Sequence, residues 1–91
     1  MPYIEKENRK AFEKQIDALV DKLYPLECGV SVGNVNYVIS SIIWRLWERN
    51  PSYTLGNNLI GALECVKQEF YRRKLSPYED KKMEANGDVI S

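Results

Sequence analysis

The sequence predicts an all-α fold: a three-helix bundle with a docked C-terminal segment, and it leaves open a short pairing of the two chain ends. Two observations predict this fold. Apolar residues recur every three or four positions in three segments, and proline or polar capping residues stand at the ends of those segments. Its 91 residues fit a single domain, with helices at about residues 8–24, 35–50 and 54–74 and a C-terminal segment at 76–91.

The first expected helix is amphipathic. Asn8 is a plausible N-cap, and Pro25 ends the helix because proline disfavours helical backbone in the residue before it. Most charged residues fall off the apolar stripe. The stripe consists of Phe12, Ile16, Leu19, Val20 and Leu23.

The second expected helix is apolar around more than half of its circumference, which is typical of a helix covered on more than one side. Asn34 or Asn36 would cap it, and Asn50-Pro51 would end it. Trp44 points away from much of the apolar set, so it either covers a second surface or meets a partner. The set comprises Val35, Val38, Ile39, Ile42, Ile43, Leu46 and Trp47.

The third expected helix opens at Ser52 or Thr54. Gly56 and Gly61 lie inside it, although each glycine costs about 1 kcal/mol relative to alanine in a helix. Close approach of the second helix or of a ligand would explain them. The apolar stripe is formed by Leu55, Leu59, Leu63, Val66 and Phe70.

Ser76-Pro77 is expected to break the chain after the third helix, with one or two helical turns within residues 77–85. Asn86-Gly87 is a turn signal. Short apolar pieces remain at the two ends, Tyr3-Ile4 and Val89-Ile90, and we expect these pieces to pair or to pack side by side.

Composition excludes several function classes. The chain has 13 basic and 13 acidic residues, and this balance argues against general nucleic-acid binding, which needs excess positive charge. Histidine is absent, so a His-dependent triad is excluded within one chain. Cys28 and Cys65 form no CxxC pair and cannot make a standard zinc site; a disulfide between them is the minor alternative. No apolar run reaches membrane-spanning length and no signal peptide is evident, so we expect a cytoplasmic protein without cofactor.

A polar stretch near the C-terminus is the main candidate for ligand or partner binding. Arginine offers a planar fork for carboxylate or phosphate, and tyrosine offers a stacking ring with a hydroxyl. The same residues also suit a helix end tied by salt bridges, which is the structural alternative. The candidate residues are Glu64, Lys67, Glu69, Tyr71, Arg72, Arg73, Tyr78, Glu79 and Asp80.

Three further patterns favour structural roles over function. Glu64 and Lys67 share a helix face with Tyr71, where a partly buried ion pair is expected. No two glutamates are three residues apart, so the acid pairs of all-helical, magnesium-dependent nucleotide pyrophosphatases are missing. An aromatic set with nearby Arg45 and Arg49 resembles a nucleic-acid stacking surface, but core or dimer packing explains it better. That set is Tyr37, Trp44, Trp47 and Tyr53.

Several short motifs follow one another along the chain. They are Met1-Pro2-Tyr3-Ile4, Asn36-Tyr37, Glu69-Phe70-Tyr71-Arg72-Arg73, Pro77-Tyr78-Glu79-Asp80 and Asn86-Gly87-Asp88-Val89. Together they resemble a family of small uncharacterised proteins found in bacteriophages and prokaryotes. The likeness covers nearly the whole chain, although Ile90 stands where an aromatic residue is expected. It implies a standalone protein with an ordered C-terminal segment, and it names no substrate or catalytic residue.

These observations favour a small non-enzymatic binding or regulatory protein that acts through protein contacts, as a homo-oligomer or with another protein. Nucleic acid and membrane are not expected partners. The alternative is a protein that binds a nucleotide-like anion, or a minor enzyme, using the Arg/Tyr/Glu cluster. In that case Glu64 or Glu69 would be the group that transfers protons, since histidine is absent.

Overall fold

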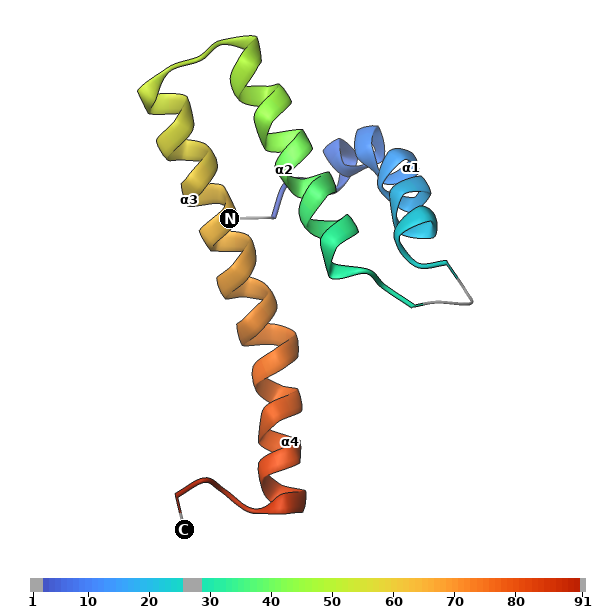
Figure 1. The fold of residues 1–91 in the computed structure, drawn as a ribbon, viewed down its shortest axis with the longest axis vertical. Coiled ribbons are helices and arrows are strands. Elements are labelled where there is room, and N and C mark those ends of the chain that lie inside the picture. Colours follow the sequence, from blue (N-terminus) through green and yellow to red (C-terminus); the bar gives the residue numbers. More distant parts are fainter. Residues whose placement is uncertain (1–2, 26–28, 91) are drawn as a thin grey trace. The chain divides into compact units, whose positions relative to one another are not determined.

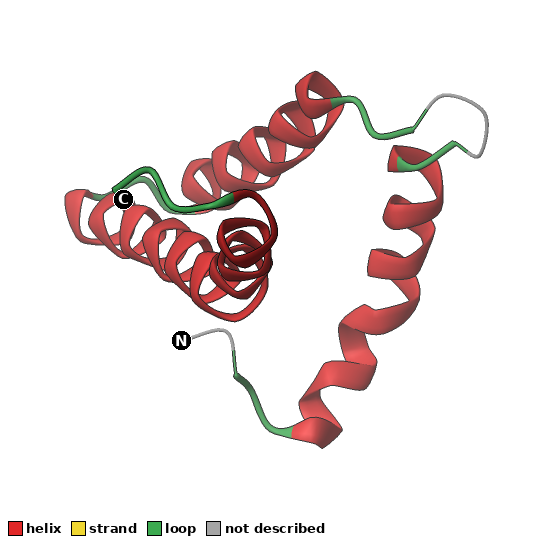
Figure 2. Ribbon diagram, turned by 90° about the horizontal axis from the view of Figure 1, so that it is seen from below, coloured by secondary structure: helices red, strands yellow, loops and turns green. Residues whose placement is uncertain are grey.

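The computed structural model describes residues 3–25 and 29–90. Within these residues the chain is helical, and no strand occurs (Figures 1 and 2). The prediction of an all-α chain with three long helices is confirmed. The helices are α1 (Lys6–Leu23), α2 (Val32–Arg49), α3 (Tyr53–Phe70), the π-helical turn η1 (Tyr71–Leu75) and α4 (Ser76–Asn86).

The contacts of the chain divide it into two units, Tyr3–Asn57 and Asn58–Ser91. The first unit holds α1, α2 and the beginning of α3. The second holds the remainder of α3 with η1 and α4. The single domain over residues 1–91 stays a prediction.

Helix α1 begins two residues earlier than expected. Glu5 is its N-cap, with extended backbone and no side-chain cap hydrogen bond, so the prediction that Asn8 caps the helix is wrong. The backbone N–H of Asn8 instead donates to the carbonyl oxygen of Glu5, 3.0 Å away, as a first-turn residue does. The helix ends at Leu23, ahead of Pro25, as predicted.

Helix α2 also begins earlier, because its cap is a serine. The backbone N–H of Asn34 donates to Ser31 Oγ at 3.4 Å, which satisfies one of the unpaired donors of the first turn. Asn34 and Asn36 therefore lie inside the helix, and the prediction that either one caps it is wrong. Asn36 accepts a hydrogen bond from the Ser40 hydroxyl, 3.2 Å away.

Ser52 opens α3, as one of the two predicted caps. The backbone N–H of Leu55 donates to Ser52 Oγ at 3.0 Å. The Trp47 indole Nε1 donates to the Ser52 carbonyl oxygen at 3.2 Å, and this places the ring near Gly56: a Cβ added there would lie 3.6 Å from Nε1. This is ordinary van der Waals distance, so the close approach predicted to explain Gly56 is not observed. Nor is it observed at Gly61, since nothing lies within 4 Å of a Cβ built on it.

Ser76-Pro77 does not break the chain, in contrast to the prediction. Helix α3 passes through the π turn η1 into α4 without a loop. The backbone N–H of Ser76 bonds to the carbonyl oxygen of Tyr71, a step of five residues instead of four. In an α-helix the ring of Pro77 would clash with the carbonyl four residues earlier, and the wider turn relieves that clash. The C-terminal segment is therefore mainly a helix.

Helix α4 ends at Gly87, where φ is +91°, a region that side-chain-bearing residues rarely adopt. The Gly87 backbone N–H closes the helix on the carbonyl of Met83 at 2.8 Å. Neither Tyr3-Ile4 nor Val89-Ile90 is in a strand, so their packing stays a prediction.

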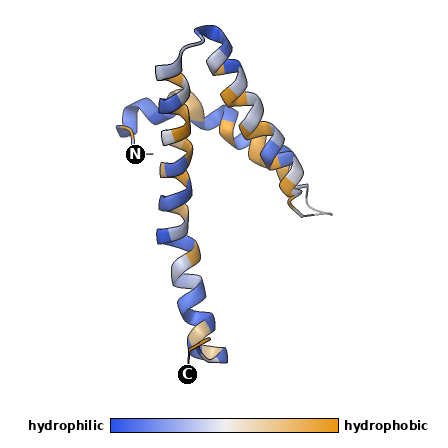
Figure 3. Ribbon diagram, turned by 60° about the vertical axis from the view of Figure 1, so that its left-hand side comes forward, coloured by the Kyte–Doolittle hydropathy of each residue, from blue (hydrophilic) through white to orange (hydrophobic). Residues whose placement is uncertain are grey.

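None of the described residues is fully buried. Apolar residues recur along α2 and α3 among polar ones (Figure 3). Apolar residues of the three long helices are half-exposed or more at many positions: Phe12 is 56% exposed, Trp44 65% and Phe70 63%. The stripes found in the sequence are present as helix faces whose residues stay partly exposed.

Candidate functional site

Glu64 and Lys67 form an ion pair on the surface of α3. Glu64 Oε1 lies 3.1 Å from Lys67 Nζ and accepts a second bond from Gln68 Nε2 at 3.2 Å. The Lys67 bond, the Gln68 bond and the charge of Lys67 lower the pKa of Glu64, in that order of importance. Because the Glu64 side chain is 50% exposed, the expected partial burial is wrong. A lowered pKa is the opposite of what a proton-transferring Glu64 would need.

Glu69 and Arg72 form a second pair one turn later. One guanidinium nitrogen of Arg72 donates to both carboxylate oxygens of Glu69, at 3.0 and 3.1 Å. Glu69 is the more covered partner, with 20% of its side chain exposed against 67% for Arg72. The guanidinium proposed for an anionic ligand therefore already holds a carboxylate of its own helix.

Tyr71 in η1 is brought together with Glu79 in α4. The hydrogen bond to the Glu79 carboxylate, followed by the Glu79 charge, raises the pKa of the Tyr71 phenol; slight desolvation and the charge of Asp80 add to the shift. Both carboxylates line a hollow of about 410 Å³ beside Tyr71. Of the predicted set, these three residues converge most clearly.

The hollow is completed by the end of α4 and the tail behind Gly87. Its lining combines carboxylates, one lysine, an aromatic ring and apolar side chains. The lining residues are Tyr71, Ser76, Glu79, Asp80, Lys82, Met83, Asn86, Gly87, Asp88 and Val89. Such a surface suits a cationic or amphipathic group better than a phosphate, because the carboxylates outnumber the lysine.

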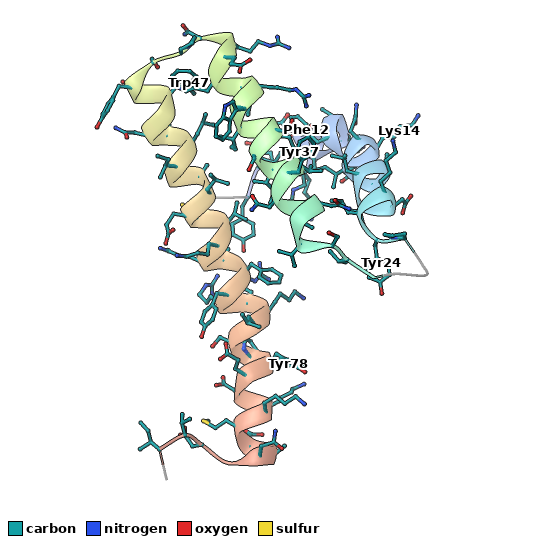
Figure 4. The ribbon with its side chains drawn as sticks, viewed as in Figure 1. Phe12, Lys14, Tyr24, Tyr37, Trp47 and Tyr78 are labelled. Carbon is teal, nitrogen blue, oxygen red and sulfur yellow. The ribbon has the colours of Figure 1, made fainter. Side chains whose placement is uncertain are left out.

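Tyr78 lies outside this hollow. Its ring receives the ammonium group of Lys82, with Nζ 5.7 Å from the ring centroid, a cation–π distance (Figure 4). The predicted cluster is thus dispersed around the helical run. It contains the pairs Glu64–Lys67, Glu69–Arg72, Tyr71–Glu79 and Tyr78–Lys82.

A second hollow, of about 430 Å³, lies along one face of α2. It is shallow and mainly apolar, with two serines between two aromatic rings. Its lining is Tyr37, Ser40, Ser41, Trp44, Arg45 and Glu48. Trp44 lines this hollow and is 65% exposed, so both predicted roles, covering a second surface or meeting a partner, stay predictions. Trp47 turns to the loop before α3 (Figure 4). The two tryptophans therefore make different contacts, although they are three residues apart in the sequence.

Sequence reasoning missed part of the C-terminal hollow. Ser76, Met83 and Val89 are not among the predicted binding residues, and they reach the hollow because η1 and the Gly87 turn bring them beside Tyr71. The Asn86-Gly87 turn was the available signal that the tail changes direction at that point.

Residues 3–25 and 29–90 contain no group of three or more potential metal ligands among histidine, cysteine, aspartate and glutamate. No helix within those ranges combines the length and apolarity needed to cross a bilayer. Cys65 is a half-buried free thiol, and Cys28 lies outside the described residues, so its suggested disulfide is untested.

Comparison with known proteins gives one match. No curated protein and no solved structure matches the chain. A family model described as Domain of unknown function (DUF6899) matches residues 1–89. This match covers both units and the C-terminal motifs, and it agrees with the resemblance to an uncharacterised family. The chain belongs to the DUF6899 family.

Proposed function

We propose that this protein is a small non-enzymatic binding or regulatory protein that acts through protein contacts, first of all with copies of itself, in the cytoplasm. The observation that carries the proposal is the exposure of the apolar faces. No described residue is fully buried, although all three long helices carry large apolar side chains. Folding is driven by removing such surface from water, so these faces need a cover.

Helix α2 supports the proposal most strongly. Its apolar residues extend around more than one side, and the hollow at Tyr37 and Trp44 lies outside the main stripe. A helix with two apolar sides needs two neighbours, whereas an amphipathic surface helix needs one. Aromatic side chains such as Trp44 are also those that carry most energy in protein interfaces.

The electrostatics of the polar cluster favour protein contacts over the anion-binding alternative. Lys67 and Arg72 each hold a carboxylate of α3, at 3.1 and 3.0 Å. A phosphate would have to displace Glu64 and Glu69 and would meet the repulsion of their charges. Glu79 and Asp80 add further negative charge at the C-terminal hollow.

Size-exclusion chromatography with light scattering tests self-association. We expect a mass of at least two chains of 10.6 kDa at micromolar concentration, and a lower mass for Phe70→Ala, which shortens an apolar side chain that is 63% exposed. Lys14→Ala, an exposed residue of α1, is the control and should keep the wild-type mass. A monomer at high micromolar concentration with full helicity would show that the apolar faces are covered within one chain, and would remove self-association from the proposal.

A thermal-shift screen across nucleotides and phosphorylated metabolites tests the alternative. A ligand that binds the folded state raises the melting temperature by mass action. We expect no shift. A shift that Arg72→Ala abolishes would favour anion binding by the polar cluster and would contradict the proposed protein-contact role.

A further inference from the structure

Residues 58–86 form one uninterrupted helical run, here called the helical arm. It contains most of α3 and the whole of the π turn and α4. At about 1.5 Å per residue the arm is about 43 Å long. Leu59, Leu63, Val66 and Phe70 recur at steps of four, three and four, which is the spacing of a coiled-coil seam. Val66 and Phe70 on this seam are 56% and 63% exposed.

The π turn continues the seam into α4. In a regular α-helix Leu75 would lie about 140° away from Phe70 around the axis, because each residue turns the helix by about 100°. The π turn adds one residue to its turn, and so it brings Leu75 back toward the Phe70 side. Tyr78 follows one turn later. Leu75 is 42% exposed and Tyr78 57%.

Charge is distributed unevenly along the arm and its tail. Residues 64–75 carry four cations and two carboxylates, and residues 76–90 carry two cations and four carboxylates. Two copies placed in parallel would set like charges side by side. Two antiparallel copies would set each basic half against an acidic half, which is favourable on both sides of a two-fold axis.

One antiparallel register fits both the apolar seam and the uneven charge of the arm. With the two-fold axis inside η1, Lys67 of one copy lies opposite Glu79 of the other, and Glu64 lies opposite Lys82. Leu63, Val66 and Phe70 then face, in that order, the apolar stem of Lys82, Tyr78 and Leu75. The Glu64 and Lys67 side chains are 50% and 72% exposed, so they are accessible to a second copy.

We propose that two copies of the chain associate through their helical arms, antiparallel, with the Leu59–Phe70 seam as the apolar centre and Lys67–Glu79 contacts on its flank. This inference rests on the proposed self-association and specifies its surface and symmetry. The two-fold arrangement makes each contact twice, so single changes act twice in the dimer.

Charge exchange tests the register. Lys67→Glu and Glu79→Lys should each raise the dimer dissociation constant about tenfold, because two exposed ion pairs become two like-charge contacts. The double variant Lys67→Glu/Glu79→Lys should return to within about threefold of wild type, which shows coupling between the two positions. Lys14→Glu changes the net charge of the chain by the same amount as Lys67→Glu. It lies in α1 and should leave the dissociation constant unchanged. Additive losses in the double variant would overturn the register.

Disulfide trapping tests the antiparallel direction. In a background with Cys28→Ser and Cys65→Ser, Lys74→Cys lies next to the axis and should cross-link two copies under mild oxidation. Val66→Cys should not, since its two copies lie about 21 Å apart along the arms, far beyond disulfide reach. Cross-linking at both positions would indicate parallel arms. A wild-type dimer with no Lys74→Cys cross-link would refute the arm interface and leave self-association standing, whereas a monomer would refute both.

Discussion

Trp47 joins the end of α2 to the start of α3 through one side chain. Its indole N–H donates to the Ser52 carbonyl oxygen, and its ring lies beside Gly56. Trp44, one turn earlier, lines the α2 hollow and is 65% exposed against 41% for Trp47. Substitutions of these two tryptophans can therefore be compared directly, because Trp47 makes a hydrogen bond to the start of the next helix and Trp44 is mainly exposed.

We predict that Trp47→Phe lowers the free energy of unfolding by about 1 kcal/mol, the net value of a lost hydrogen bond. The Ser52 carbonyl oxygen still accepts from the Gly56 backbone N–H, 3.0 Å away, so the loss stays near this value. Urea denaturation followed by circular dichroism measures it. Trp44→Phe keeps an aromatic ring on the α2 hollow and should change the value by less than about 0.5 kcal/mol. Equal decreases in the free energy of unfolding for the two variants would show that the Trp47–Ser52 hydrogen bond does not stabilise the fold.

Glu64 gives a prediction about pH. Its pKa is lowered in the folded chain, so its contribution to stability is complete above the pKa of the unfolded chain and is lost as pH falls through the folded pKa. Lys67→Met should raise the pKa of Glu64 toward the ordinary value, since Lys67 is the largest cause of the shift. Gln68→Ala should raise it less. Carboxyl carbon chemical shifts during an NMR titration report each value, and an unchanged pKa in Lys67→Met would contradict the ion pair.

At the scale of helices, the existence of α1, α2 and α3 followed from the sequence, whereas the starts of α1 and α2 and the continuation of α3 through η1 into α4 did not. Apolar residues with a helical period identify all three long helices. In α1 and α3 they form one strongly apolar face, and in α2 they cover a wider part of the circumference. The starts of α1 and α2 lie two and three residues earlier than expected. Several polar residues precede each stripe, and which of them caps depends on backbone geometry that composition does not reveal.

The sequence predicted which residues belong to the polar cluster, but it did not predict how they are arranged in space. The pairs Glu64–Lys67 and Glu69–Arg72 follow from spacings of three along a helix. The contact of Tyr71 with Glu79 spans eight residues and depends on the π turn. Ser-Pro was taken as a stop, whereas a wider turn accommodates the proline ring and lets the helix continue.

The Ser52 cap gives a prediction at this scale. Ser52→Ala removes the acceptor of the Leu55 backbone N–H and should destabilise the chain by about 1 kcal/mol. Thr54→Ala, two residues further into the same turn, is the control and should cost less than half of that. Urea denaturation of the two variants measures the free energy of unfolding. A larger decrease for Thr54→Ala than for Ser52→Ala would show that the cap is assigned to the wrong residue.

For the whole molecule, exposure of the apolar faces predicts that stability depends on concentration. If association covers these faces, a hundredfold increase in chain concentration should raise the melting temperature by several degrees, because dimers are favoured by mass action. Differential scanning calorimetry at low and high micromolar concentration measures the shift. A melting temperature independent of concentration would indicate that each chain is stabilised alone.

The π turn also has a consequence for insertions and deletions. It holds one residue more than an α-helical turn, and Pro77 is compatible with the helix because of that residue. Deletion of Lys74 should therefore destabilise the chain by about 3 kcal/mol, as an interior helical proline does. The same deletion combined with Pro77→Ala should recover most of this loss in urea denaturation. The extra residue and the proline are thus expected to be gained or lost together when the length of this helical run changes.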